Sequence, residues 1–560
     1  MNNLIEKIRN AVIGDLRLIN TSFGAKPLVY ADYTASGRSL TFIEDYIMGQ
    51  VLPFYGNTHT ENSFTGAQTT ALREQARQIV RQSVNGSEDD QIIFCGSGAT
   101  AAINKLIDIL NLRLPADLAE RHQLEAQISA EQRPVVFIGP YEHHSNELPW
   151  RESTADLEAI PLDINGQIDT HVLEQKLQQY SDRPLRIGSF SAASNVTGIK
   201  TNVNKITALL HKYDCLSFWD YAAAAPYVSI DMNTQGERDC SKDAVFISPH
   251  KYIGGPGTPG ILIVKKQILN NSVPSAPGGG TVMYVTPKDH KFISNHERRE
   301  EGGTPAIVES IRAGLAIKLQ QEVGTDTIVE KEEKFIRRAL ARWGQFDDIE
   351  VLGNSEADRL SIVSLRIKHQ GKDLHYGFVV ALLNDLFGIQ ARGGCSCAGP
   401  YGHSLLGMDL AYSKGLEAEI LKGVIILRPG WVRLNFNYFI DEDTFEYLTR
   451  AIELVAEHGW RLLPYYDFDR SNGRWDYQEN KMALVSSLSD FDFKTMGDTK
   501  IGEVSSKPLA EYTDIAIDEI TRSNRNACRY VMILPASAEK LRWFVLPQEI
   551  NAELGTIKAS

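Results

Sequence analysis

Short apolar runs rich in β-formers alternate with helical patterns from about residue 29 to residue 265. Strands that alternate with helices predict a large, doubly wound and mostly parallel α/β sheet. The runs that we interpret as buried strands are 134–139, 186–190, 215–220, 244–248 and 260–266, and the helical patterns between them include 100–114 and 202–214. Ligands bind beyond the carboxyl ends of the strands in such sheets. The polar residues just after each strand are therefore the first candidates for a functional site.

After residue 300 the pattern changes to that of a smaller α+β domain. Residues 303–324 and 330–346 predict helices, and residues 359–367 and 430–439 predict antiparallel strands. We expect an N-terminal arm, a large domain, a small domain and a C-terminal extension of unknown role, at 1–28, 29–300, 301–465 and 466–560.

The C-terminal extension reads as an appended segment that is partly a linker. It contains a Ser/Asp-rich stretch at 485–500 and two strand-like runs at 528–535 and 541–547. Whether it covers a site, extends an interface or docks a partner stays open.

Charge and cysteine content exclude several classes of protein. The 560 residues carry 71 acidic and 58 basic side chains, a net charge of −13 that argues against general binding to nucleic acid or anionic membranes. The chain shows no apolar run of about 18 residues and no signal-peptide core at its beginning. Six cysteines do not make a disulfide scaffold. The sequence therefore predicts a reduced, cytoplasmic protein.

The stretch 243–266 is the most specific signal. A strand ends near Ser248, then His250 and Lys251 follow, and a Gly/Pro-rich loop leads into the next strand. A lysine beside such a turn suits a Schiff-base enzyme, because its amine must reach a bound aldehyde while the backbone passes close by. Taken alone, the stretch is more typical of a surface lysine in a turn.

Other strand ends carry residues of matching chemistry. Asp220 ends one strand, where a carboxylate can pair with a protonated pyridine nitrogen. A Gly/Ser turn before a helix near Thr100 would hold a phosphate at the helix N-terminus. His143, His144 and Asn195 come after two further strands. Each of these signals is weak on its own.

Together, in this order, the motifs resemble fold-type I pyridoxal-phosphate enzymes of the class V aminotransferase group, and within it cysteine desulfurases and selenocysteine lyases most of all. The resemblance covers roughly residues 28–460. It implies the fold-type I transferase fold, pyridoxal 5'-phosphate as cofactor, and Lys251 as the Schiff-base lysine. It also implies that Asp220 pairs with the pyridine nitrogen, that His143 stacks on the ring, and that Asn195 lies near the ring oxygen or the substrate carboxylate. The phosphate would be held by Ala99, Thr100, Ser248 and His250.

The resemblance further implies a homodimer with shared active sites. Thr304, in the segment 301–305, matches the residue that contacts the phosphate bound by the partner subunit. Arg433 matches the arginine that anchors the substrate carboxylate, which suits a guanidinium because it can donate two parallel hydrogen bonds. Arg392 is a second candidate at the rim of the site. Without the resemblance, Arg433 is equally typical of an exposed strand.

The chain departs from this family pattern at two places. Ala223 stands where a glutamine usually bonds the ring oxygen. The active-site loop reads Arg-Gly-Gly-Cys-Ser-Cys at 392–397, so two histidines of the pattern are replaced by Cys395 and Ser396 while Cys397 stays in register.

Cys395 and Cys397 admit four interpretations. A disulfide between residues i and i+2 would be strained, and a zinc site lacks a second ligand pair beyond His403, so we expect no metal. Small packing residues are a serious alternative. The favoured interpretation is a nucleophile at Cys397, activated by Arg392 or a nearby imidazole. Cys95, Cys215 and Cys240 read as packing residues, and Cys528 has no assigned role.

The leading hypothesis is therefore a cysteine desulfurase-like enzyme that cleaves the C–S bond of L-cysteine or a related amino acid, giving alanine and a persulfide on Cys397. This hypothesis also implies a sulfur-acceptor protein as a partner. The alternative is a class V aminotransferase, or another pyridoxal-phosphate lyase or epimerase, that needs no cysteine nucleophile. A non-catalytic scaffold would not need to keep Lys251, Asp220 and His143 together.

Overall fold

The computed structural model describes residues 2–58, 60–235, 239–479, 487–490, 493, 502–522 and 530–559. The chain forms two compact units. Unit 1 holds residues 1–13, 34–331 and 356–360, and unit 2 holds residues 14–33, 332–355 and 361–560. The division into domains expected from the sequence, with a boundary at residue 300, stays a prediction; by contacts, residues 301–331 belong to unit 1.

The centre of unit 1 is a seven-stranded sheet of order β4-β10-β9-β8-β7-β5-β6. Only β10 runs antiparallel to its neighbours, so the expected mostly parallel α/β sheet is confirmed. The strands are β4 (Asp90–Cys95), β5 (Val135–Ile138), β6 (Asp156–Ala159), β7 (Arg186–Ser191), β8 (Leu216–Asp220), β9 (Ala244–Ile247) and β10 (Gly260–Lys265). Five of the seven match the apolar runs of the sequence, because a strand buried on both faces is an uninterrupted apolar run.

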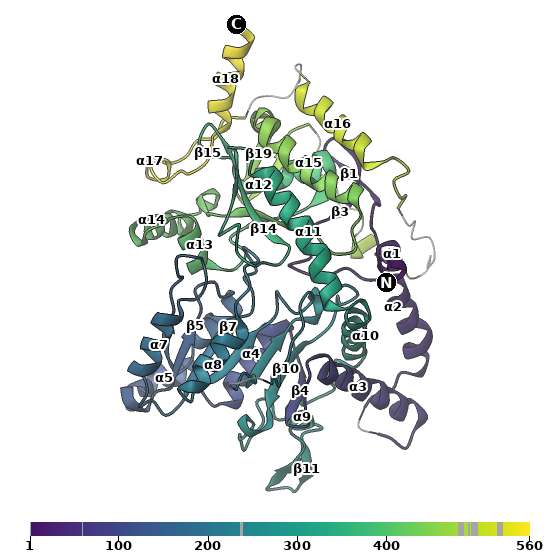
Figure 1. The fold of residues 1–560 in the computed structure, drawn as a ribbon, viewed down its shortest axis with the longest axis vertical. Coiled ribbons are helices and arrows are strands. Elements are labelled where there is room, and N and C mark those ends of the chain that lie inside the picture. Colours follow the sequence, from purple (N-terminus) through teal and green to yellow (C-terminus); the bar gives the residue numbers. More distant parts are fainter. Residues whose placement is uncertain are drawn as a thin grey trace. The chain divides into compact units, whose positions relative to one another are not determined.

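Helices pack against this sheet and against each other (Figure 1). Those of unit 1 are α1 (Asn2–Ala11), α2 (Thr41–Tyr46), α3 (Phe64–Ser83), α4 (Gly98–Ile109), α5 (Ala116–His122), α6 (Leu148–Arg151), α7 (Thr170–Gln179), α8 (Val203–Lys212), α9 (His296–Arg299) and α10 (Ile307–Val323). Helix α4 buries a stripe of small and branched residues in the core: Ala99, Ala102, Ile103, Leu106 and Ile107. Helix α10 lies along α3, where Gly314 lets the backbones approach, since a Cβ at Gly314 would come within 2.7 Å of the Ala76 Cβ.

A two-stranded hairpin leaves the body of unit 1. It consists of β11 (Val282–Val285) and β12 (His290–Phe292), and Figure 1 shows it projecting beyond the rest of the unit. Three of the four β11 side chains, Met283, Tyr284 and Val285, are exposed. The hairpin therefore presents an apolar strand to the outside of this chain.

Unit 2 is the smaller α+β unit. Its main sheet has the order β13-β14-β18-β17, with β15 paired to β14, and all pairs are antiparallel as expected. The strands of unit 2 are β1 (Leu18–Thr21), β2 (Gly24–Pro27), β3 (Val29–Tyr30), β13 (Ile349–Val351), β14 (Ile362–His369), β15 (Lys372–Asp373), β16 (Ile389–Gln390), β17 (Arg392–Gly394), β18 (Trp431–Asn435), β19 (Tyr466–Asp469) and β20 (Arg474–Tyr477). Its helices are α12 (Tyr376–Phe387), α13 (Gly399–Leu405), α14 (Leu410–Leu421), α15 (Glu442–His458), α16 (Leu509–Thr521), α17 (Ala536–Glu539) and α18 (Pro547–Ala559).

Helix α11 (Thr325–Trp343) begins in unit 1 and ends in unit 2. The sequence predicted it at 330–346. It begins five residues earlier, right after Gly324, whose φ of +81° ends the preceding helix.

The C-terminal extension is part of the core of unit 2. Phe468, Trp475, Tyr512 and Phe544 are among its buried residues. The strand-like interpretation of 541–547 is wrong: the segment makes one isolated bridge, at Phe544, and α18 begins at Pro547. Its aromatic side chains pack in the core of unit 2. The pattern of a short apolar run does not distinguish such a packed segment from a buried strand. Cys528 and most of 485–500 lie outside the described residues.

Within the described part of the chain, no helix is long and apolar enough to cross a membrane.

Candidate active site

The carboxyl ends of the parallel strands of unit 1 gather most of the residues singled out in the sequence. Strands β4, β5, β7, β8 and β9 point the same way, so the residues that come after them meet at one edge of the sheet. In strand order these residues are Ala99 and Thr100, His143, Asn195, Asp220, and Ser248 with His250 and Lys251.

The N-terminus of α4 forms a narrow cradle. The Ser248 hydroxyl accepts a hydrogen bond from the Ala99 amide at 2.8 Å. Gly98 has a φ of +58°, and a Cβ at this position would lie 2.9 Å from the Ser248 Oγ and 3.6 Å from the His250 ring. Only a glycine leaves this space open. A helix N-terminus, a hydroxyl and an imidazole converge here, which is a donor set suited to a phosphate.

Lys251 lies near the start of the tightly folded loop between β9 and β10, three residues after Ser248 of this cradle. Its amide donates to the Ser248 carbonyl at 3.0 Å, and the Gly37 amide donates to the His250 carbonyl at 2.8 Å. A Cβ at Gly255 would lie 2.0 Å from the Pro249 carbonyl oxygen, so the glycines of this loop let it close on itself. Burial, together with the positive charge of Lys251, lowers the pKa of His250 to about 4. His250 is therefore neutral near pH 7.

His143 is connected to the cradle by a chain of hydroxyl groups. The Thr100 and Ser145 hydroxyls are 2.6 Å apart, and the Ser145 hydroxyl lies 3.0 Å from His143 Nδ1. The Ser145 amide donates to the same Nδ1 at 3.1 Å. Because Nδ1 accepts, a neutral His143 carries its proton at Nε2. Ser145 is a contributor that the sequence did not single out.

Two carboxyl groups are buried at this edge. Burial raises the pKa of Asp220, while the Ala222 amide and the charge of Lys251 oppose that rise. Burial also raises the pKa of Glu142 to about 7, although Ser191 and Asn146 donate to it. The sequence analysis did not single out Glu142. Its position, one residue before a candidate ring-stacking histidine, was the available signal.

Thr304 is exposed, but the segment that carries it is firmly attached to the edge strand β4. The Glu297 and Glu301 carboxylates accept from the Ile92 and Phe94 amides at 2.8 and 2.7 Å. They take the place of a neighbouring strand along this edge. Glu301 begins the segment 301–305.

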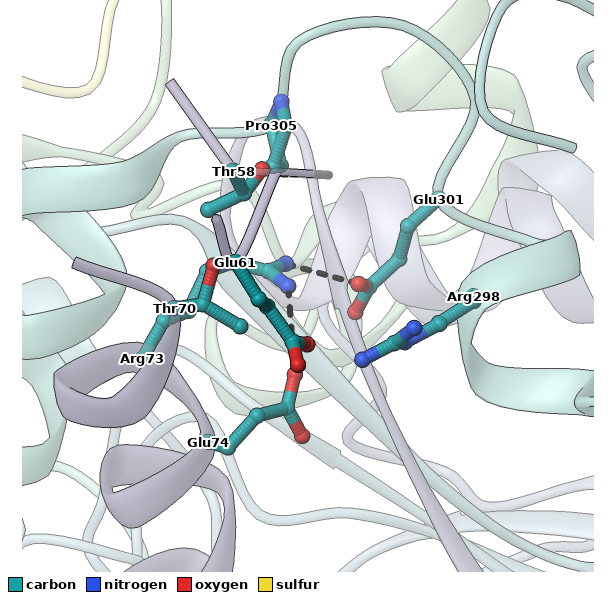
Figure 2. A pocket seen from close by; sticks show the side chains of 8 residues that line it. All are labelled: Thr58, Glu61, Thr70, Arg73, Glu74, Arg298, Glu301 and Pro305. Atoms are coloured by element: carbon teal, nitrogen blue, oxygen red, sulfur yellow. Dashed lines mark hydrogen bonds and ion pairs between the residues drawn. The ribbon is translucent and has the colours of Figure 1, made fainter. Parts of the chain in front are cut away.

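Buried arginines of α3 hold these carboxylates in turn. Arg77 contacts Glu301 with two bonds of 3.0 Å, and Arg73 contacts it at 2.6 Å. Figure 2 shows Arg73 pointing from α3 toward Glu301, in a small pocket bordered by Pro305. The ion pairs hold the pKa of the buried Glu301 below its usual value. Neither arginine was singled out in the sequence.

In unit 2, the two candidate substrate-binding arginines share one aspartate. Arg433 on β18 and Arg392 on β17 lie opposite each other in the antiparallel pair. Arg433 Nη2 is 3.0 Å and Arg392 Nε 2.8 Å from the Asp32 carboxylate. Arg433 is buried and Arg392 is exposed. A guanidinium group suits the binding of a further carboxylate, because it can donate two parallel charge-assisted hydrogen bonds. No pattern in the sequence pointed to Asp32, which is 401 residues away from Arg433.

The cysteine loop, residues 395–398, follows β17. Cys395 and Cys397 are both exposed, and Ser396 and Cys397 have left-handed backbone angles of φ +53° and +55°. Such angles are unfavourable for residues other than glycine. The Trp431 indole N–H donates to the Ser396 hydroxyl at 3.2 Å and holds this conformation. Among the described residues, no three His, Cys, Asp or Glu side chains are grouped as a metal site would require.

The buried cysteines, Cys95 in β4 and Cys215 just before β8, are of a different kind. Burial raises the pKa of Cys95 to about 12 and that of Cys215 further. Both thiols stay protonated near neutral pH, whereas the two loop cysteines are open to solvent.

Comparison with known proteins identifies the family. The family model described as "Aminotransferase class-V" matches residues 29–412. The chain belongs to the class V aminotransferase family. It is 28% identical over 400 residues to a cysteine desulfurase of Enterobacter sp. strain 638, across 71% of this chain and 89% of that protein. It is 26% identical over 399 residues to a probable cysteine desulfurase of Staphylococcus aureus, across 70% of this chain and 88% of the relative.

Solved structures support the same fold. The apo structure of the cysteine desulfurase from Thermococcus onnurineus NA1 matches with a TM-score of 0.62 at 21% identity, over 77% of this chain and 95% of that one. The S-sulfonic acid form of the Escherichia coli cysteine desulfurase CsdA matches with a TM-score of 0.60 at 20% identity, over 76% and 94%. This fold is that of the fold-type I pyridoxal-phosphate enzymes.

Class V aminotransferases are pyridoxal-phosphate-dependent enzymes, and the residues of unit 1 fit that cofactor. The space at Gly98, which a Cβ would fill, lies between the Ser248 hydroxyl and the His250 ring, as a phosphate site requires. Asp220 is buried, with a raised pKa, and a cationic ring nitrogen beside it would favour the charged form of this carboxyl.

Proposed function

We propose that this class V enzyme is a cysteine desulfurase, which removes the sulfur of L-cysteine and releases alanine. The observation that carries the proposal is the presence, in one chain, of the Lys251 cradle and of an exposed Cys397 held in a left-handed turn. The relatives that bear the name cysteine desulfurase support it.

The cradle residues take the roles that the family resemblance gives them. The N-terminal turn of α4, with Ala99 and Thr100, would hold the phosphate together with Ser248 and His250. Asp220 would hold the proton on the ring nitrogen, His143 would stack on the ring, and Asn195 would lie near the ring oxygen, where Ala223 offers no donor. When bound, the cofactor supplies an electron sink for the charge that develops at the substrate Cα.

Lys251 would move the proton. Its amine removes the proton from the substrate Cα and returns a proton later. His143, with its proton at Nε2, offers the substrate a hydrogen-bond donor on a ring whose other nitrogen is fixed by Ser145. Arg433, and Arg392 at the rim, would bind the substrate carboxylate, because both guanidinium groups lie at Asp32 and such a group can donate two parallel charge-assisted hydrogen bonds to a carboxylate.

Cys397 would accept the sulfur. Its thiolate attacks the substrate sulfur, so that an S–S bond forms as the substrate Cβ–S bond breaks. The electron pair of the broken bond passes to the carbon side, where protonation completes alanine. Cys397 keeps the sulfur as a persulfide. An exposed loop suits this task, since the persulfide must next meet an acceptor.

We further propose that the enzyme works as a homodimer in the cytoplasm. The segment from α2 to the start of α3 exposes a run of large apolar side chains that a second copy would cover: Phe42, Tyr46, Met48, Leu52, Phe54, Tyr55 and Phe64. In that assembly Thr304 would reach the phosphate of the partner's site. A protein that accepts sulfur from Cys397 is the second expected partner.

Product analysis with a panel of amino acids tests the proposal. We expect L-cysteine with a reductant to give equal amounts of alanine and sulfide. Pyruvate with ammonia would indicate elimination instead, and a keto acid with an aminated acceptor would indicate transamination. Either of these results as the main outcome contradicts the proposed desulfuration.

A further inference from the structure

The C-terminal segment 541–550 is joined to the small sheet of unit 2. Phe544 forms a parallel bridge with Asp373, and the Val545 amide donates to the Asp373 carbonyl at 2.9 Å. Glu549 of α18 pairs with Lys372 at 2.9 Å. Phe544 and Val545 are buried. This segment lies outside the family match, which ends at residue 412.

The segment brings Trp543 into a cluster of rings around His375. Trp543 stacks on His375 with centroids 5.4 Å apart and planes inclined by 23°. Its indole N–H donates to the Leu427 carbonyl at 3.1 Å, which fixes the ring plane. Trp475, also from the extension, donates to His375 Nδ1 at 3.1 Å. His375 donates from Nε2 to the Ile426 carbonyl at 3.2 Å, so both of its nitrogens are engaged.

Tyr376 is the next ring of the cluster. It stacks on His375 at 4.4 Å and lies parallel to Trp543, at 6.2 Å with an angle of only 9°. Stacked aromatic pairs stabilise each other beyond their buried area. Tyr376 is thereby held by one residue of the family core and by one residue of the extension.

The ring of Tyr376 lies directly on the backbone that leads into the cysteine loop. A Cβ at Gly393 would lie 2.8 Å from the Tyr376 ring, and so would a Cβ at Gly430. This explains why glycine stands at position 393, two residues before Cys395. Gly394, the other member of the pair, has a φ of +119°. Burial, and then the nearby Cys395 thiol, raises the pKa of Tyr376 to about 12.

We propose that the C-terminal segment is a positioning element of the cysteine loop, with Trp543 pressing Tyr376 onto β17 and so fixing where Cys395 and Cys397 stand. Trp543 and Tyr376 touch no reacting atom; they act through the backbone of Gly393 and Gly394. The inference deepens the proposed function, on which the catalytic consequence rests. It assigns a role to an extension that the matched family core lacks.

The experiment compares two tryptophans of unit 2 that have the same kind of contacts. Trp460 also stacks on a histidine, His369, at an angle of 23°, and also donates its indole N–H to a carbonyl, that of Glu457, at 3.1 Å. It does not belong to the ring cluster on Tyr376. Trp460→Ala is therefore the matched control for Trp543→Ala. Trp543→Phe keeps a stacking ring and serves as the rescue.

The main readout is the rate at which iodoacetamide alkylates each loop cysteine in the full chain, resolved by mass spectrometry of the peptide. We expect Trp543→Ala to change the rate at Cys395 or Cys397 by about threefold or more, because a loop that loses its support samples more open states. Trp543→Phe is expected to stay within about twofold of the wild type, as is Trp460→Ala. In turnover, Trp543→Ala should lower kcat for L-cysteine more than it raises KM, since the buried arginine Arg433 lies on β18 and keeps its contact with Asp32.

Trp543→Leu guards against a variant that does not fold, because it keeps apolar volume while removing the ring and its N–H. Wild-type alkylation rates at both cysteines in a folded Trp543→Ala or Trp543→Leu protein would overturn the inference. Equal changes in Trp460→Ala would overturn it too, since they would show a general loss of stability. Alkylation needs no enzymatic turnover. If alkylation follows Trp543 but L-cysteine yields no alanine, the proposed function fails and the positioning role stands.

Discussion

The cradle of unit 1 and the cysteine loop of unit 2 are built in opposite ways. Ser248 in the cradle and Asp220 at the same edge of the sheet are 4% and 5% exposed, and both are fixed at the ends of parallel strands. Cys395 and Cys397 are exposed, on a loop with two left-handed residues and one anchoring tryptophan. Groups that hold a cofactor through every turnover gain from burial, which preserves their geometry. A group that must pass sulfur to an acceptor has to remain accessible.

The largest effect is expected in the cradle. Lys251→Ala should lower alanine formation from L-cysteine by about 10⁴-fold, because it removes the residue that handles the Cα proton. The purified variant should also lose the absorbance of the covalently held cofactor. Lys266→Ala, at an exposed lysine directly after the carboxyl end of β10, is the control. Turnover retained in Lys251→Ala would contradict the proposed role of Lys251 in moving the Cα proton.

The loop is expected to show the next largest effect. Cys397→Ala should reduce sulfide release by about 10²-fold or more, since the nucleophile is lost. Cys395→Ala, at an equally exposed thiol two residues away, should lose less than about tenfold. Steady-state rates with L-cysteine and a reductant measure both. If the two variants exchange places, Cys395 is the sulfur acceptor.

Arg433 and Arg392 allow a buried and an exposed group to be compared within one sheet. Arg433→Lys should raise KM for L-cysteine by about 10- to 100-fold, because a lysine cannot reproduce a paired, charge-assisted contact with a carboxylate. Arg392→Lys, at the exposed partner in the strand pair, should raise KM by less than about tenfold. A larger effect at Arg392 than at Arg433 would place the substrate carboxylate at the rim.

The smallest effect is expected from Glu142, on the way the free energy of unfolding depends on pH. Its pKa is about 7 in the folded chain against 4.5 for a solvated glutamate, so between these values the folded state keeps a proton that the unfolded state releases. The free energy of unfolding should therefore fall as pH rises from about 4.5 to about 7, by up to about 1.4 kcal/mol per pH unit.

Chemical denaturation of the wild type and of Glu142→Gln at several pH values measures this contribution. The glutamine variant should lack it and give a flatter profile over that window. Glu120→Gln, at an exposed glutamate of α5, should retain the wild-type profile. Identical slopes in wild type and Glu142→Gln would show that Glu142 stays ionised in the fold.

The cradle could be predicted from the sequence because its positions obey a simple rule. Buried parallel strands are continuous apolar runs, and the residues after their carboxyl ends meet at one edge of the sheet, so Asp220, Ser248 and Lys251 were placed together without a structure. Asp32 could not be found in this way, since its partners Arg392 and Arg433 come from the far end of the chain.

The C-terminal segment shows a different limit. Residues 541–547 combine aromatic and branched side chains, which favour a strand by propensity. In the structure Trp543 and Phe544 pack around His375 instead, and only one bridge forms. Tertiary packing overrode the local preference, and the partner, a buried neutral histidine, cannot be recognised from the segment itself.

A single-turnover experiment tests the central claim most directly. The purified protein is mixed with one equivalent of L-cysteine per subunit without reductant, and the peptides are then mass-analysed alongside the released amino acid. The account predicts one alanine per added sulfur on the protein, with the mass of one sulfur atom added to the peptide at Cys397. Alanine without added mass at Cys397, or added mass at another cysteine alone, would contradict it.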